Sequence, residues 1–366
     1  MKIFKEWKAP FLVNSGDAST GHQTNPQVVG LFNGWFLIAW AEQFGDGAPG
    51  NDSDIVGKIY NADGVVVYDS DILNYEWVVG KQFTFDVAPS HDGFLHVYFD
   101  SDFPDDTVRI ERTFEDESYL FAWLFNSGSF ESPNIAANLL SDNDDIFIVF
   151  ENTSAGSLDA VVIDENDGFS SVFPVLAPGT VADRLRVDDA TILSNGNFAT
   201  LLWNGGANYV SIVGPDGTFL SQTLIATSAT PTEFARDLAS LAGGGFVVVG
   251  ETNYGFDGIF ARLYDNAGLV VVETTPIEVD GSVSKDARVA ALPDGGFVVM
   301  FEAGSGRFHA QLFDANGLSE TEPVLIGDGG FFGNRPELTV TADGRIIFVW
   351  NGEQGTGTNT EIFSSF

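Results

Sequence analysis

The sequence has no cysteine, 2 methionines and 4 histidines among its 366 residues. Without cysteine the chain can form neither a disulfide framework nor a thiolate metal site. The histidines, His22, His91, His96 and His309, follow no paired metal-binding spacing, so we do not expect a transition-metal enzyme. A nucleophile-elbow motif, a phosphate loop and a dinucleotide fingerprint are also missing from the sequence.

Basic residues are scarce as well. The chain has 16 lysines and arginines against 52 acidic residues, which gives a formal charge of -36. Such a body repels phosphate backbones and anionic lipids, so we expect no nucleic-acid partner. No apolar run of about 18 residues occurs, which predicts no membrane insertion. The first segment, MKIFKEWKAPFLVN, lacks the apolar stretch of a cleavable Sec signal.

A short turn pair followed by an apolar, β-rich run recurs seven times. The copies are NGWFLIAW from Asn33, DGFLHVYF from Asp92, NDDIFIVF from Asn143, NGNFATLLW from Asn195, GGGFVVVG from Gly243, DGGFVVMF from Asp294 and DGRIIFVW from Asp343. The second turn residues are 59, 51, 52, 48, 51 and 49 residues apart. A period of about 50 residues is the length of one propeller blade.

Each copy predicts a four-stranded antiparallel meander. Asn-Gly and Asp-Gly pairs are typical of a two-residue hairpin turn in which both central residues have positive φ. A strand of small residues precedes the turn, as in DLASL from Asp237, and a third strand with a second turn follows the apolar run, as in RLYDNAG from Arg262. The predicted fourth strands are PVLAP from Pro174, QTLIA from Gln222, TPIEV from Thr275 and PVLIG from Pro323.

The two ends of the chain complete one repeat. The seventh copy ends at TEIFSSF, which is only a third strand, while residues 9–14 (APFLVN) form a fourth strand ahead of the first copy. We therefore predict an all-β, seven-bladed β-propeller whose N-terminal strand completes the last blade. The single domain, 1–366, would have its blades at about 27–80, 84–132, 134–179, 186–228, 235–280, 286–328 and 335–366 plus 1–14. The alternatives, a pair of β-sandwiches or a β-helix, fit the seven equal periods less well.

The stretch VNSGDASTGHQTNPQVVGLFNGWFLIAWAEQFGDG, with ALPDGGFVVMFEAGSG and HAQLFDANG, resembles propeller-type repeats of large bacterial surface and RTX-type secreted adhesin proteins. The resemblance covers all seven copies and is carried by turn glycines and core aliphatic residues, which specify a fold but no chemistry. It implies an extracellular adhesion or display role without an assigned catalytic residue. The calcium-binding nonapeptide GGxGxD repeats that often accompany such modules are absent from this sequence.

Two acidic loops follow the second strands of the first two blades. The candidate ligands in them are Asp46, Asp52, Asp54, Asp100, Asp102, Asp105 and Asp106. Carboxylate oxygens at this density suit Ca²⁺, so calcium is the one cofactor that we consider. Neither loop has the 12-residue EF-hand pattern, and solvated acidic surface on a strongly negative protein explains the loops equally well.

Arginines precede the turns of blades 4 to 7, at Arg186, Arg236, Arg288 and Arg335. An arc of guanidinium groups can grip the carboxylate of an acidic sugar bidentately. The second strands end on the same edge with Glu151, Glu251 and Glu302, which join the candidate ligand-binding residues. The simpler interpretation is a set of cross-strand salt bridges, with Arg236 paired to Glu251 and Arg288 paired to Glu302.

Aromatic residues end the second strand in six copies, at Trp40, Phe99, Phe150, Trp203, Phe301 and Trp350. Exposed rings are used for sugar binding, but a repeating aromatic residue predicts packing between blades first.

No catalytic constellation is present, which favours a non-catalytic binding, adhesion or display module and not an enzyme. Its loop face would recognise a glycan or a protein, outside the cell or on a surface. One alternative is a structural subunit of a virion or another surface assembly, marked by a broad apolar patch. The other is a carbohydrate-active hydrolase or lyase that uses acids such as Asp100, Glu151 and Glu251.

Overall fold

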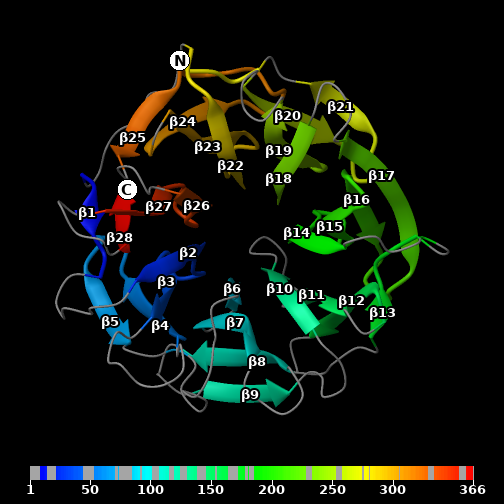
Figure 1. Cartoon of the computed structure of the whole chain (residues 1–366), viewed down its shortest axis with the longest axis horizontal. Helices are drawn as coiled ribbons and strands as arrows, with labels where there is room; N and C mark the ends of the chain where they lie inside the picture. Colours follow the sequence, from blue (N-terminus) through cyan, green and yellow to red (C-terminus); the bar gives the residue numbers. More distant parts are fainter. Residues whose placement is uncertain are drawn as a thin grey trace. The chain divides into compact units, whose positions relative to one another are not determined.

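Seven antiparallel sheets of four strands contain every strand of the described residues. In this computed structural model those residues are 9–14, 22–43, 53–70, 73, 85–90, 93–100, 107–114, 119–123, 130–137, 146–152, 155–163, 172–177, 180, 185–227, 233–252, 258–273, 276–279, 281–304, 306–328, 334–353 and 360–365. The sheets are the blades of a seven-bladed β-propeller (Figure 1), which confirms the predicted fold class. Across these segments there is no helix long and apolar enough to cross a membrane.

The strands follow one another in chain order within each of the first six blades. Blade 1 contains β2 (Gln23–Gly30), β3 (Phe36–Gln43), β4 (Ser53–Tyr60) and β5 (Val66–Ser70); blade 2 contains β6 (Phe85–Ser90), β7 (Gly93–Asp100), β8 (Thr107–Phe114) and β9 (Tyr119–Trp123); blade 3 contains β10 (Phe130–Ala137), β11 (Ile146–Asn152), β12 (Ser157–Ile163) and β13 (Phe173–Pro174). Blade 4 contains β14 (Arg186–Ile192), β15 (Phe198–Asn204), β16 (Ala207–Val213) and β17 (Phe219–Thr227); blade 5 contains β18 (Glu233–Ser240), β19 (Phe246–Thr252), β20 (Ile259–Tyr264) and β21 (Val270–Glu273). Blade 6 contains β22 (Ser284–Ala291), β23 (Phe297–Ala303), β24 (Arg307–Phe313) and β25 (Val324–Asp328); blade 7 contains β26 (Asn334–Val340), β27 (Ile346–Glu353), β28 (Thr360–Ser365) and β1 (Phe11–Leu12).

The chain divides into two compact units. One unit includes Phe130–Gly304 with Ala310–Val324, and so holds blades 3, 4 and 5 and most of blade 6. The other includes Phe4–Ser129 with Ser305–His309 and Leu325–Phe366, and so holds blades 1, 2 and 7. The residues that carry the functional argument all belong to the first unit.

The N-terminal strand completes the last blade, as the sequence predicted. Strand β1 pairs antiparallel with β28, with Phe11 opposite Ser364 and Leu12 opposite Phe363. The backbone N–H of Val13 continues this pairing by donating to the carbonyl of Ile362 at 2.8 Å. The fourth strand of blade 7 therefore comes from the opposite end of the chain, which leaves its third strand covered by a hydrogen-bonded partner.

In blades 1 and 4 to 7 the turn between the first and second strands has three residues and not the predicted two, whereas in blade 2 Ser90 pairs with Gly93 across the predicted two. In blade 1 the N–H of Gly34 donates to the Leu31 carbonyl at 3.0 Å, and the N–H of Leu31 donates to the Trp35 carbonyl at 2.8 Å. Of the turn pair only the glycine has a positive φ, 80°, whereas Asn33 accepts the Trp35 N–H on its side-chain oxygen. The expectation that both turn residues have positive φ is wrong: this is a type I turn closed by a left-handed glycine.

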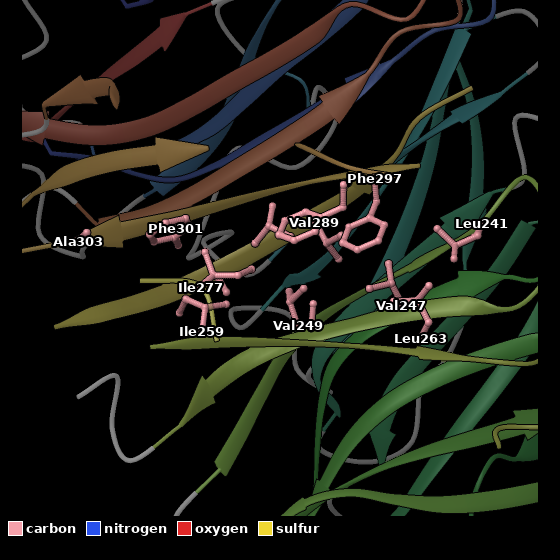
Figure 2. Packing of buried hydrophobic residues seen from close by; sticks show 14 residues of the cluster. Leu241, Val247, Val249, Ile259, Leu263, Ile277, Val289, Phe297, Phe301 and Ala303 are labelled. Atoms are coloured by element: carbon pink, nitrogen blue, oxygen red, sulfur yellow. The ribbon is translucent and has the colours of Figure 1, made fainter. Parts of the chain in front are cut away.

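The apolar cores lie between consecutive blades. In the cluster shared by blades 5 and 6, Val247 and Val249 of β19 pack with Val289 of β22 and with Phe297 and Phe301 of β23 (Figure 2). A second strand thus packs against a neighbouring blade on each of its faces, and all seven residues of β23 are buried. This explains why the second strands are continuous apolar runs without polar alternation.

One predicted strand lies elsewhere. The fourth strand of blade 5 is β21, whereas the segment TPIEV contributes a single bridge in which Ile277 and Ile259 exchange hydrogen bonds of 2.8 and 2.9 Å. Pro276 lacks an N–H and so cannot extend this bridge into a ladder.

Candidate functional site

A repeated hydrogen bond joins adjacent blades of the unit that holds blades 3 to 6. The carboxylate of Glu151 in blade 3 accepts the backbone N–H of Val187 in blade 4 at 3.0 Å. The carboxylate of Glu251 in blade 5 accepts the N–H of Asp286 in blade 6 at 2.8 Å. Both N–H groups lie at a β-bulge of a first strand, where the ladder is interrupted. The glutamates are buried and supply the acceptor that the bulge removes.

Blade 4 has a tryptophan where the neighbouring blades have this glutamate. Trp203 follows Phe198 by the same interval as Glu251 follows Phe246, so the two occupy equivalent positions of the second strand. The link to blade 5 is instead made by Asn208, which lies opposite Trp203 on β16 and accepts the N–H of Ala235 at 3.1 Å. Trp203 therefore has no part in this hydrogen bond between blades 4 and 5.

Trp203 belongs to a row of four side chains at one edge of blades 4 and 5, which we call the Trp203 surface: Arg186, Trp203, Phe234 and Arg236. The rings of Trp203 and Phe234 are stacked, with centroids 5.7 Å apart and planes at 23°. Cζ of Arg186 lies 5.9 Å from the Trp203 ring centroid, and Cζ of Arg236 lies 5.9 Å from the Phe234 ring centroid. Both rings are partly exposed, as are the arginines, whose side chains are 50 % and 36 % accessible.

Strand register positions these four residues. Arg186 is directly opposite Trp203 in the β14·β15 ladder, and Phe234 is opposite Glu251 in the β18·β19 ladder. Arg236 is the extra residue of the bulge between Ala235 and Asp237, which turns its side chain out of the normal alternation. The surface is thus built on paired strands of two packed blades, which is a rigid support for binding groups.

Each arginine of the Trp203 surface is paired with a carboxylate of the protein. Arg236 binds Glu251 through two hydrogen bonds of 3.0 and 3.2 Å, and Nε of Arg186 binds Asp188 at 2.7 Å. Burial opposes the charge of Arg236, but its hydrogen bonds to Glu251 and the carboxylate charge outweigh this effect, so its pKa is raised. The predicted cross-strand pair of Arg236 and Glu251 is therefore confirmed.

Asp188, the partner of Arg186, is partly enclosed, with a side chain that is 12 % accessible. Its second oxygen accepts a hydrogen bond from the Asn208 amide at 2.9 Å, so Asn208 connects the link between the blades to the Arg186 ion pair. Burial raises the pKa of Asp188, and the charges of the three nearby arginines offset only part of that shift.

Arg288 lies at a different place from the other arginines. It is opposite Met300 and corresponds to Asp237 of blade 5 and Asp189 of blade 4, each four residues before the leucine that precedes the turn. Asp189 accepts the N–H of Leu238 at 3.0 Å, and Asp237 accepts the N–H of Val289 at 2.7 Å. These acids form a second series of links from one blade to the next.

The two linking acids also contact each other. Burial, and then the charge of Asp189 and a hydrogen bond with it, raise the pKa of Asp237 well above its usual range. Arg288 and the Val289 N–H act in the opposite direction with smaller effect. Asp189 and Asp237 thus lie in hydrogen-bond contact at a place where burial and like charge both disfavour the ionised form of Asp237.

The remaining predicted site residues divide into two groups. Register places Lys285 opposite Glu302, and Lys285 Nζ binds that carboxylate at 3.0 Å, whereas Arg288 is opposite Met300. Asp54 is buried in β4. Asp46, Asp52, Asp102, Asp105 and Asp106 lie outside the described residues, as do the side chains of Asp100 and Arg335. Within the described part of the chain, no group of three or more histidines and acids could hold a metal ion.

The predicted packing role of the aromatic residues is confirmed for four of them. Trp40, Phe150, Phe301 and Trp350 are buried, and Trp350 is 1 % exposed. Trp203 differs from these four: Leu202 occupies the buried position of blade 4, and Trp203, the next residue, is partly exposed and stacks on Phe234 of blade 5. Counting from Phe198 instead of comparing strand ends would have revealed the difference.

No protein-family model and no curated protein sequence matches this chain significantly. Among solved structures, an acylaminoacyl peptidase of Pyrococcus horikoshii is similar over 94 % of this chain and 51 % of its own, at 12 % identity and a TM-score of 0.54. A Lactobacillus plantarum protein is similar over 88 % and 94 %, at 13 % identity and a TM-score of 0.53. A Trypanosoma rangeli sialidase in complex with the inhibitor DANA is similar over 99 % and 58 %, at 11 % identity and a TM-score of 0.50. This chain thus spans about half the length of the two enzymes, and the likeness is one of fold alone.

Proposed function

We propose that this chain is a non-catalytic binding module that recognises a glycan or protein ligand through the Trp203 surface. The observation that carries the proposal is the replacement of a linking glutamate by Trp203, together with the transfer of its hydrogen bond to Asn208. Packing between blades does not need a partly exposed indole at this position, because Leu202 fills the buried site. A partly exposed ring beside arginines is the composition typical of a recognition surface.

The state of the acids supports a binding role over a catalytic one. Glu151 and Glu251 are committed to main-chain N–H groups, and Glu251 also to Arg236. A glycoside hydrolase needs two carboxyl groups about 5 to 9.5 Å apart with room for a sugar or water between them. Asp189 and Asp237 are close enough to share a hydrogen bond and also hold backbone groups.

The test is a combined array of glycans and extracellular proteins, probed with the full chain and with Trp203→Ala. We expect at least one ligand whose signal is lost in the variant and retained in Arg345→Ala, which changes a partly exposed arginine paired with Asp343 in blade 7. Ligands that bind both proteins equally would contradict the proposal, as would cleavage of the bound glycan. Repeating the array with EDTA tests whether the acidic loops of blades 1 and 2 bind calcium.

A structural role is the second candidate, because apolar side chains are exposed on neighbouring outer strands. Leu220 and Leu224 of β17 are 50 % and 53 % exposed, and Leu269, Val270 and Val271 at β21 are 66 %, 51 % and 64 % exposed. The turn before β21 packs against β17, where Ser221 donates to the Ala267 carbonyl at 3.1 Å. For this role the occupant would be a second copy of the chain, and light scattering at increasing concentration would show self-association that Val271→Asp abolishes.

A further inference from the structure

The charges of the Trp203 surface are already balanced within the protein. Arg236 has two of its N–H groups on Glu251, and Arg186 has its Nε on Asp188. A guanidinium group that is paired in this way attracts a further carboxylate weakly, because the neighbouring acid repels it. The arrangement therefore differs from the unpaired arc of arginines expected from the sequence, which would have gripped an acidic sugar.

The same pairs leave donors and acceptors for neutral groups. The half-exposed Arg186 is held through its Nε, so its terminal nitrogens extend beyond the ion pair. Each oxygen of Asp188 accepts one hydrogen bond, from Arg186 or from Asn208, and retains a second lone pair. Fixed donors next to fixed acceptors suit vicinal hydroxyl groups, each of which both donates and accepts.

The stacked rings supply the apolar part of the surface. Trp203 and Phe234 stack on each other and are both partly exposed, and the exposed part of a π system carries a partial negative charge that attracts the polarised C–H groups of a ligand. A pyranose ring has such a C–H face and a rim of hydroxyl groups. Its face would contact Trp203 while its rim reaches Arg186 and Asp188, which lie on the strand paired with that of Trp203.

We infer that the Trp203 surface binds an uncharged, hydroxyl-rich glycan, with one sugar ring on Trp203 and its hydroxyl groups on Arg186 and Asp188. This inference rests on the proposed function and narrows it to one class of ligand. Its basis is the row of stacked rings, each with an arginine beside it that is already paired.

The experiment compares neutral oligosaccharides with their uronate counterparts. Calorimetric titration of the full chain with mannan and galactan oligosaccharides, and with mannuronate and galacturonate oligomers of equal length, separates charge from shape. We expect at least one neutral sugar to bind about tenfold tighter than its uronate partner. Its affinity should also stay constant between about 0.05 and 0.5 M NaCl, because no net charge is screened.

Variants locate the binding to this surface. Trp203→Ala should weaken the neutral sugar about tenfold or more, Trp203→Phe should retain most of the affinity, and Arg345→Ala should leave it unchanged. Far-UV circular dichroism of each variant reports whether the fold is kept.

Three outcomes would overturn the inference. Tighter binding of the uronates, with affinity falling as salt rises, would show that the arginines act as an anion site; the proposed function would stand. If a protein ligand binds and is lost in Trp203→Ala while no sugar binds, the inference fails and the proposed function stands. Absence of any ligand sensitive to Trp203→Ala would remove both.

Discussion

The junction between blades 4 and 5 and the junction between blades 5 and 6 solve one backbone problem in two ways. Each first strand has a bulge whose N–H needs an acceptor from the preceding blade. Glu251 supplies that acceptor to blade 6 from the second strand, whereas Asn208 supplies it to blade 5 from the third. The difference shows that a repeat can move a structural hydrogen bond to a neighbouring strand and so release an edge position for Trp203.

Removing the glutamate of the junction between blades 5 and 6 should have the largest effect on stability. Glu251→Ala leaves the Asp286 N–H without its acceptor and Arg236 without its carboxylate, and we expect a loss of about 3 kcal/mol in the free energy of unfolding. Urea unfolding followed by tryptophan fluorescence measures the change. Glu273→Ala is the matched control, since Glu273 also pairs with an arginine but its side chain is 64 % exposed; the control should lose under about 0.5 kcal/mol. Equal losses in the two variants would contradict the structural role.

The 4–5 junction should be weakened by Asn208→Ala, by about 2 kcal/mol, because a buried N–H and Asp188 each lose a partner. Restoring the arrangement of the other junctions sharpens the test: Trp203→Glu, added to Asn208→Ala, should recover about 1 kcal/mol by offering the acceptor from the second strand. A double-mutant cycle on urea unfolding measures this coupling. Purely additive effects would mean that the two positions do not exchange the same role.

The acid pair that links blades 4, 5 and 6 should make stability depend on pH. Because the pKa of Asp237 is raised in the folded state, the folded protein holds this proton over a range where the unfolded chain, with a pKa of about 3.9, has lost it. Stability from this group is therefore greatest at low pH and falls as pH rises toward the folded pKa. Asp237→Asn removes the titration and keeps a donor to Asp189 and an acceptor for the Val289 N–H.

We thus expect Asp237→Asn to be more stable than the natural protein at pH 7, by about 1 to 2 kcal/mol, with the advantage shrinking toward pH 4. Urea midpoints between pH 4 and 8 measure it. Asp286→Asn serves as the control, because Asp286 is exposed to solvent on one side and pairs with Lys285. A variant less stable than the natural protein at pH 7 would show that Asp237 is ionised.

The repeat, the closure and the number of blades follow from the sequence because turn residues and apolar runs recur at a fixed interval. The register of the first strands of blades 4, 5 and 6 does not follow, because each of these three has a bulge that shifts side chains by one position. Because of that shift, Arg186, Arg236 and Arg288 occupy three different positions along their first strands. The same shift puts Lys285 beside Glu302. The turn geometry was missed because Asn-Gly is typical of both the two-residue hairpin and the three-residue loop found here.

Trp203 itself provides the smallest expected effect on stability. Trp203→Ala removes a partly exposed ring whose position makes no hydrogen bond to the next blade, so we expect a loss under about 1 kcal/mol. Trp350→Ala, which empties a buried position, should cost about 4 kcal/mol in the same urea experiment. If both tryptophans cost the same, Trp203 is a packing residue and blade 4 differs from its neighbours for structural reasons alone. If Trp350→Ala strongly lowers stability and Trp203→Ala lowers only ligand binding, position 203, where the neighbouring blades have a glutamate, serves recognition.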